Sequence, residues 1–317
     1  MTYELFIKHG STLMFPPIVD GVTIEWQRSG QPGKLTFECV KTENLSFSEG
    51  DVCRFSVDNT PLFYGFVFEK ARTGSSFEKI KVTVYDQLYY LKNKDFFQYE
   101  NKTATEVIRM LAEDFGLNLG ALKDTSYKIA SRTEDNKTLF DIIQSALDET
   151  LKATTRMYVL YDNAGKLTLS DIADMKLGIV ISEDTAGDYD YKSSIADNTY
   201  NKIRLFREGS ATVTVKDAST IAQWGVLQYA EKVSDSNVNL NSMAASLLKL
   251  YNTKTRTLSV KNVLGDTRVR AGTLLAVVLG LGDINVSNYM LCEQVKHTFN
   301  NGRHLMELKL RGGSFVA

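Results

Sequence analysis

The chain has 317 residues, which is enough for two or three domains with separate cores. Hydrophobic residues make up 43% and charged residues 24%, so the composition excludes an intrinsically disordered chain. The net charge of -1 gives no overall basic field that would drive sequence-independent binding to nucleic acid. The N-terminus lacks a signal-peptide pattern, and no apolar run reaches the roughly 20 residues of a membrane helix. We therefore expect no membrane contact, no specific nucleic-acid binding, and a protein kept in a cytosol after synthesis.

The first part of the chain, residues 1–94, has the pattern of short strands separated by turns. Several short strands of alternating polarity at this spacing are typical of a β-sandwich or a small β-barrel. We therefore predict an N-terminal β-barrel domain. Its expected strands cover residues 22–26, 34–39, 52–57, 63–68 and 80–84.

The middle part, residues 95–190, changes to a helical period. Thr103 and Glu106 have the spacing of a capping box, which satisfies free backbone donors at a helix start. A second amphipathic helix is expected over 139–151, and a β-hairpin over 157–170. These elements predict a small α+β domain.

The last part, residues 191–317, returns mainly to strands. We predict a C-terminal β-barrel domain with one or two inserted helices, one of them over 240–251. Its expected strands cover residues 202–206, 211–215, 257–260, 274–279, 290–295 and 304–310.

The ends of the first and last parts repeat one pattern. Gly50-Asp51 precedes three strands, and Gly272-Thr273 precedes three strands of similar length with turns at matching places. Convergent β-meanders are the alternative explanation. The predicted fold class is α+β and β-rich, with two small β-barrel domains separated by a small α+β domain. A ring of such chains would present twice as many similar surfaces as it has subunits.

The sequence contains no convincing catalytic site. We expect His297 and His304 to be solvated or half-buried strand residues, and His9 is the only other histidine. Cys292 and His297 are five positions apart in a strand, so they lie on opposite faces and do not form a dyad. We expect buried free thiols, no catalytic residues, no cofactor and no metal. Acidic residues in polar loops are interpreted as solvated charges: Asp124, Glu134, Asp135, Glu183, Asp184 and Asp188.

Two further surface features allow alternative interpretations. An aromatic cluster at the junction of the first and middle parts indicates either packing between domains or a protein or sugar contact surface. Polar loops around 182–194 and 234–241 are expected to face neighbouring proteins. The aromatic residues are Tyr89, Tyr90, Phe96, Phe97 and Tyr99.

Segments along almost the whole chain resemble the XkdQ/YqbQ family of tail hub proteins from contractile phage tails and phage-like particles. The number and order of the segments carry the resemblance, since none is a catalytic signature. Within them, the residues expected to mark the fold are Gly50, Asp51, Gly65, Asp86, Gly225, Gly265 and Gly272. The segments are 47–52 (FSEGDV), 62–70 (LFYGFVFEK), 84–94 (VYDQLYYLKNK), 103–108 (TATEVI), 136–144 (NKTLFDIIQ), 222–228 (AQWGVLQ) and 265–273 (GDTRVRAGT).

The resemblance implies a structural baseplate hub rather than an enzyme. Such a hub would be a homotrimer, in which two tail-tube-like barrels per chain form a pseudo-sixfold ring around an axial channel. Its expected partners are the tail tube protein, the spike or tip protein, other baseplate proteins including a LysM-type tail protein, and the tape measure protein in the channel. It would assemble in the host bacterial cytoplasm and then belong to a phage tail or a bacteriocin-type particle. The alternatives are a carbohydrate- or receptor-binding tail protein and a tail-associated cell-wall hydrolase.

Overall fold

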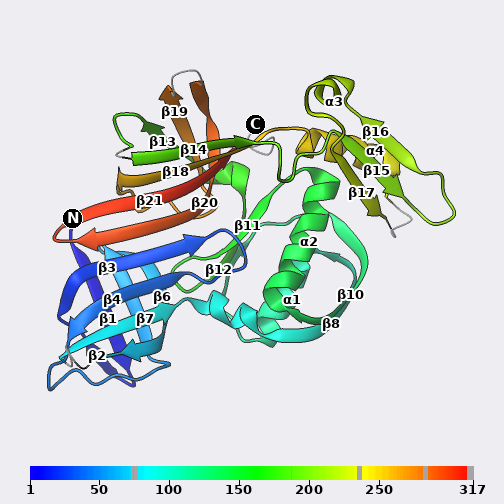
Figure 1. The fold of residues 1–317 in the computed structure, drawn as a ribbon. Coiled ribbons are helices and arrows are strands. Elements are labelled where there is room, and N and C mark those ends of the chain that lie inside the picture. The colour runs from blue at the N-terminus through cyan, green and yellow to red at the C-terminus, as the bar shows by residue number, and fades with distance from the viewer. Residues whose placement is uncertain (73, 75–77, 187, 234–237, 281–284, 313–317) are drawn as a thin grey trace.

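The computed structural model of the chain describes residues 1–72, 74, 78–186, 188–233, 238–280 and 285–312. Its main element is a 13-stranded sheet on one side of the molecule, beside a unit that contains two long helices (Figure 1). Along the main path, the strand order is β14-β18-β21-β20-β3-β4-β7-β6-β5-β1-β2, while β19 pairs with β20 and β13 pairs with β19. The chain is therefore mainly β-structure, as predicted.

The strands of this sheet come from both ends of the chain. From the first part come β1 (Tyr3–His9), β2 (Thr12–Met14), β3 (Ile18–Gln27), β4 (Lys34–Val40), β5 (Val52–Val57), β6 (Thr60–Ala71) and β7 (Lys79–Tyr85). From later in the chain come β13 (Lys176–Ser182), β14 (Asp188–Ser194), β18 (Thr255–Leu264), β19 (Leu274–Gly280), β20 (Asn285–Asn300) and β21 (Arg303–Gly312).

Alternating polarity explains which face of these strands is buried. In β4, Leu35, Phe37 and Cys39 are buried while the residues between them are half-buried. The buried residues of both chain ends belong to one continuous core, in which the rings of Phe55 and Phe299 lie 5.0 Å apart. At about 25 cal/mol per Å² of apolar surface, this shared core is the main stabilisation of the sheet.

The two chain ends meet where β3 pairs with β20. Residues 22–27 of β3 lie antiparallel to residues 294–299 of β20. The strands expected in two separate barrels therefore continue as one sheet, and the pairing forms no closed barrel among the described residues. Sequence patterns could not reveal this junction, because alternation indicates a buried face but not a partner strand.

The middle unit packs two helices against short strands. Helix α1 (Ala104–Asp114) begins with the predicted capping box of Thr103 and Glu106, and α2 (Leu139–Thr154) begins after Thr138 as predicted. The buried faces of both helices share a second core. The other elements are the 3-10 helices η2 (Gln87–Lys92) and η3 (Ile172–Met175) and the strands β8 (Lys94–Thr103), β9 (Leu119–Leu122), β10 (Lys128–Thr138), β11 (Tyr158–Asp162) and β12 (Leu167–Asp171).

Strands β13 and β14 follow the middle unit in sequence but belong to the large sheet. β13 pairs in parallel with β19, and β14 pairs antiparallel with β18. The expectation of a polar loop over 182–194 is therefore wrong for β14, although Thr185 and Ala186 do turn back on Ser182. The predicted domain limits stay a prediction: residue 94 begins β8, and residue 190 lies inside β14.

A smaller unit with its own core lies at the far end from the large sheet (Figure 1). Helix α4 confirms the helix predicted over 240–251, and β15 confirms the strand predicted over 202–206. Part of the predicted loop over 234–241, residues 234–237, lies outside the described residues. The elements of this unit are β15 (Lys202–Phe206), β16 (Val213–Lys216), α3 (Ala218–Trp224), β17 (Gln228–Lys232) and α4 (Leu240–Tyr251).

Candidate functional site

The first glycine turn holds β5 against β6. Gly50 has a φ of 91°, which favours glycine, and its N–H donates to Val67 O at 2.7 Å. Val67 N donates in return to Asp51 O at 2.8 Å, and Asp51 N donates to Ser48 O at 3.2 Å. The Asp51 carboxylate also accepts from Ser48 N at 2.7 Å. Gly50 and Asp51 thus form a turn before β5 that is hydrogen-bonded to Val67 in β6.

The second glycine turn repeats this bonding between β19 and β20. Gly272 has a φ of 98°, and its N–H donates to Cys292 O at 2.8 Å. Cys292 N donates to Thr273 O at 2.8 Å, and Thr273 N donates to Arg270 O at 3.1 Å. Each bond has its counterpart in the first turn, so the pattern found in the sequence extends to individual backbone atoms.

The strands around the two turns have the same order and direction. We call β3-β4-β7-β6-β5 the first unit and β14-β18-β21-β20-β19 the second unit. Every neighbouring pair within each unit is antiparallel. The five-stranded unit is therefore present twice, and pairing between β3 and β20 joins the copies side by side.

Both units also have a β-bulge at the same place. In β6 the extra residue is Phe68, directly after Val67, which bonds to the first glycine turn. In β20 it is Glu293, directly after Cys292, which bonds to the second glycine turn. Glu293 accepts from Arg28 Nε at 2.7 Å and from Arg311 Nε at 2.5 Å. Burial alone would raise the pKa of Glu293, but the two guanidinium groups lower it. This carboxylate therefore ties β3 to the second unit.

Two buried histidines lie next to the same junction. His297 Nδ1 and His304 Nε2 are 2.8 Å apart, His297 Nε2 bonds Val269 O at 2.9 Å, and the Trp26 ring packs 5.2 Å from His297. Burial and the neighbouring His304 lower the pKa of His297 to about 3, and burial lowers that of His304 to about 4. The expected solvated or half-buried positions are wrong, because the rings are 0% and 4% exposed. A Cβ on Gly265 would lie 2.1 Å from His304 Cγ, so this position must be glycine.

Asp86 lies where the large sheet meets the middle unit. Its buried carboxylate accepts from Gly33 N at 2.9 Å and caps η2. Burial and the Asp162 carboxylate raise its pKa, against these backbone donors and Arg270. Arg270 is stacked 3.9 Å from the ring centre of Tyr161 and donates to Asp162 O at 2.7 Å. These contacts fix the orientation of the middle unit on the sheet.

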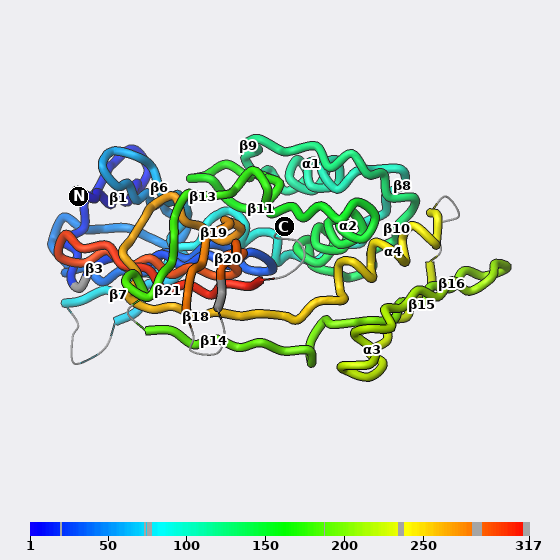
Figure 2. The backbone as a smooth tube through the Cα atoms, turned by 90° about the horizontal axis from the view of Figure 1, so that it is seen from above, coloured from blue at the N-terminus to red at the C-terminus, as the bar shows by residue number. Residues whose placement is uncertain are grey.

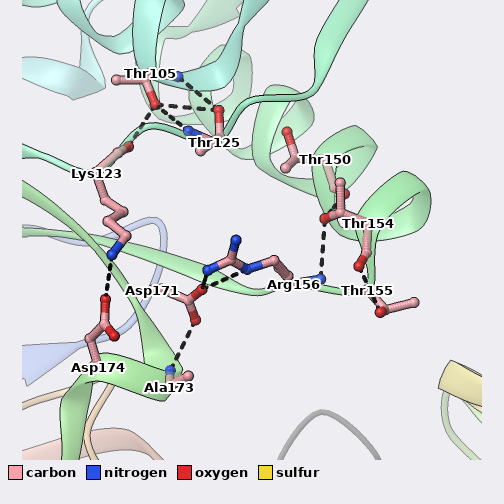
Figure 3. A network of polar contacts seen from close by, with 10 residues as sticks. All are labelled: Thr105, Lys123, Thr125, Thr150, Thr154, Thr155, Arg156, Asp171, Ala173 and Asp174. Carbon is pink, nitrogen blue, oxygen red and sulfur yellow. Dashed lines mark hydrogen bonds and ion pairs between the residues drawn. The ribbon is translucent and has the colours of Figure 1, made fainter.

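A polar network fixes the chain around η3 in the middle unit (Figure 3). Lys123 Nζ lies 2.9 Å from Asp174 Oδ2, and Arg156 donates to Asp171 Oδ2 at 2.6 Å through its Nη2. Thr105 Oγ1 donates to Lys123 O at 2.7 Å, which connects the network to α1. The network joins segments before α2 to segments after it, and its carboxylates are paired with cations.

Two of the five expected aromatics join a larger aromatic row on the large sheet. Tyr89 lies 4.1 Å from Phe68 and 5.0 Å from Tyr85 between ring centres, and Tyr90 lies 6.0 Å from Phe66. All of these rings are half-buried. The row covers the outer face of β6 beside η2.

The other three aromatics do not belong to that row. Tyr99 is buried in the core of the middle unit, and Phe97 packs against the same core 5.9 Å from it. Phe96 is 56% exposed. The five residues therefore do not form one contact surface for a sugar, and their role toward partners stays a prediction.

Two remaining signature glycines have separate reasons for their lack of a side chain. A Cβ on Gly65 would lie 2.3 Å from Tyr85 O, because β6 and β7 approach closely there. Gly225 ends α3 with a φ of 74°, and its carbonyl accepts from Asn201 Nδ2 at 2.8 Å. Sequence reasoning missed α3 itself.

Two of the acidic residues considered for catalysis, Glu134 and Glu183, have structural partners. Glu134 is 2% exposed in β10 and pairs with Arg132 at 3.1 Å and Lys137 at 3.3 Å, so its expected position as a solvated charge in a polar loop is wrong. Glu183 accepts from Gly280 N at 2.8 Å. No group of metal-ligating side chains is found in the described residues.

Cys39, Cys53 and Cys292 are buried, as predicted. A cleft of about 490 Å³ beside α2 has a charged lining that pairs internally, as in Lys152 with Glu149 at 3.5 Å.

Membrane insertion through a helix finds no support in the part of the chain that the structure covers, where every helix is too short or too polar to cross a bilayer.

The family model described as YQBQ-like matches residues 22–311. The chain belongs to the YqbQ-like family.

Individual relatives agree with this assignment. YqbQ of Bacillus subtilis (strain 168) is 30% identical over 96% of this chain and 95% of its own length, and the phage-like element PBSX protein XkdQ of the same organism is 28% identical with the same coverage. The 43 kDa tail protein of prophage MuSo2 from Shewanella oneidensis has a TM-score of 0.71 at 13% identity, over 99% of this chain and 100% of that protein. This YqbQ-like chain therefore has the fold of a prophage tail protein.

Proposed function

We propose that this YqbQ-like protein is a structural baseplate hub subunit of a contractile phage tail or a bacteriocin-type particle. One observation carries the proposal: the same five-stranded unit, with the same glycine turn and the same bulge, occurs twice in one sheet. A ring subunit would use such a repeat to present twice as many similar surfaces as there are chains.

A trimeric ring would contain six similar units. The tail-tube-like face of the ring would then match a sixfold tail tube, and its other face would keep the threefold symmetry of a trimeric spike or tip protein. The repeated sheets would surround an axial channel that admits the tape measure protein. Strands of neighbouring copies would complete the barrel that one copy leaves open. The remaining proposed partners are other baseplate proteins, including a LysM-type tail protein.

The role is non-enzymatic in this proposal. The buried carboxylates of Glu134 and Asp171 form ion pairs with Arg132 and Arg156. These pairs support a structural role for the two carboxylates rather than a catalytic one. The dispersed aromatics also argue against a glycan-binding face. Assembly would take place in the host bacterial cytoplasm, before incorporation into the particle.

The experiment is a mass measurement on the purified chain over a range of concentrations. Light scattering should give a species of three times the 35.5 kDa chain mass. A stable dimer or tetramer would contradict the proposal. Zymography on cell walls and pull-down with wall glycans should both give no signal above a buffer control.

A further inference from the structure

We infer that copies of this chain join by strand addition, with β14 of one copy pairing antiparallel to the end of β6 in the next copy. The inference rests on the proposed ring and specifies its interface. The expected partners across the interface are Ser194 with Glu69, Ser193 with Lys70, and Lys192 with Ala71. This pairing would repeat between chains the junction that β3 and β20 form within one chain.

The equivalence of β14 and β3 follows from the strand registers. Each strand is the outer neighbour of the corresponding strand in its unit: β3 lies beside β4, and β14 lies beside β18. Working outward from the glycine turns through the paired strands places Lys192 at the position of Glu25 and Tyr191 at that of Ile24. The β14 strand is therefore the second copy of the strand that makes the internal junction.

The end of β6 is equivalent to the part of β20 that receives β3. Directly after the bulge, β20 pairs with β21 on one side and with β3 on the other. In β6, the residues after the bulge pair with β7 on one side. On the other side, the last ladder pair between β5 and β6 is Val52 with Phe66. Among the described strands, none pairs with Glu69–Ala71 on that side.

Both proposed edges are exposed where their equivalents are covered. Tyr189 is 38% exposed, whereas Val22, at the equivalent position of β3, is 1% exposed. Ala71 and Lys192 are exposed, whereas their equivalents in the internal junction, Lys296 and Glu25, are half-buried. Seen from above, β14 forms the outer edge of the sheet beside β18 (Figure 2). An unpaired edge strand of this kind is a template for another chain.

The side chains at the proposed interface are compatible with this register. Glu69 and Lys192 would be diagonal neighbours on one face, within reach of an opposite-charge contact. The internal junction has the opposite-charge pair Lys296 and Glu25 directly across the strands. A shift by one residue would place Glu69 and Lys192 on opposite faces, so the charges favour the register given by the internal repeat.

Cysteine cross-linking tests this register directly. Arg28 N donates to Glu293 O at 2.9 Å, so Lys296 and Glu25 form a non-hydrogen-bonded pair, in which side chains lie closest. By equivalence, A71C with K192C should form a disulfide between chains. Both positions are exposed in a single chain, so neither substitution disturbs its core.

Three variants serve as controls under the same mild oxidation. A71C with S193C is shifted by one residue and should give at least about tenfold less cross-linked product. K296C with E25C should give the equivalent disulfide within one chain. Mixing the A71C and K192C single variants should give covalent dimers that neither variant gives alone.

The outcomes separate the interface from the proposed ring. Covalent multimers of A71C/K192C in excess over A71C/S193C support the inference. A trimer by light scattering without this excess overturns the interface and leaves the proposed function standing. A chain that stays monomeric at its highest soluble concentration, with no cross-link in any mixture, overturns both.

Discussion

His297 Nδ1 lies 2.8 Å from His304 Nε2 in the core beside the junction of β3 and β20. Both rings are held neutral there, since their pKa values are about 3 and about 4 instead of the usual 6.5. The unfolded chain binds protons at these histidines at a higher pH than the folded chain does. The stability that comes from keeping these two rings neutral should therefore be fully present above pH 6.5 and be lost as the pH drops toward 4.

Acid should destabilise the protein through these buried histidines. Between about pH 7 and about pH 5, His297 alone should remove about 2 kcal/mol from the unfolding free energy. H297Q should have a smaller unfolding free energy than wild type at neutral pH. Acidification should then lower this free energy by about 2 kcal/mol less in H297Q than in wild type. Urea unfolding at the two pH values measures the difference. The exposed His9 offers the control H9Q, and a parallel loss in H297Q and wild type would contradict the explanation.

Substitution of Gly265 should disturb the same site. A Cβ at Gly265 would lie 2.1 Å from the His304 ring, so G265A must displace the ring or the backbone. We expect a loss of about 2–4 kcal/mol in urea unfolding, the range of a disrupted core. The matched control is G178A, where no atom lies within 4 Å of the new Cβ and φ is not positive. Equal stabilities of the two variants would disprove the steric argument.

Arg270 should be far more important for stability than its near neighbour Arg268. Arg270 is buried between Tyr161 and Asp162, and R270Q should cost about 3–5 kcal/mol because it leaves buried acidic groups without a cation. Arg268 pairs with Asp266 at the surface, where its side chain is 66% exposed, and R268Q should cost less than about 1 kcal/mol. Thermal and urea unfolding of both variants should rank them in this order; the reverse order would contradict it.

Glu293 should make the junction of β3 and β20 sensitive to charge. E293Q keeps the shape but removes the carboxylate between Arg28 and Arg311, so we expect a loss of about 2–4 kcal/mol. The surface pair of Glu307 with Lys296 provides the control E307Q, with an expected effect below about 1 kcal/mol. Hydrogen exchange at β3 amides should rise in E293Q alone; unchanged exchange would show that the two arginines do not hold this strand.

Local features of the fold could be predicted from the sequence. The capping box of Thr103 and Glu106 and the apolar period of 240–251 depend on residues within a few positions of one another. Strand β14 could not be predicted in this way, because its sequence, DYDYKSS, is polar and leaves the strand partly exposed at a sheet edge. Its identity as a strand depends on β18, more than 60 residues later in the chain.

The residues at the junction show a similar limit. The Asn301-Gly302 turn could have indicated that His297 and His304 lie diagonally across one hairpin. Nothing local indicates that β3, from the other end of the chain, covers them. The contact of Arg270 with Asp162 joins residues 108 positions apart. Sequence reasoning missed this contact and the packing of β3 over the two histidines. The repeated glycine turns were visible because each repeats a local pattern.

Two equivalent units per chain should build a ring of six. Electron-microscopy class averages of the purified oligomer, viewed along its axis, would show the number and arrangement of these units. We expect a closed ring with a central channel and six similar densities arranged as three pairs. A ring with any other number of densities, or an open chain of copies, would contradict it.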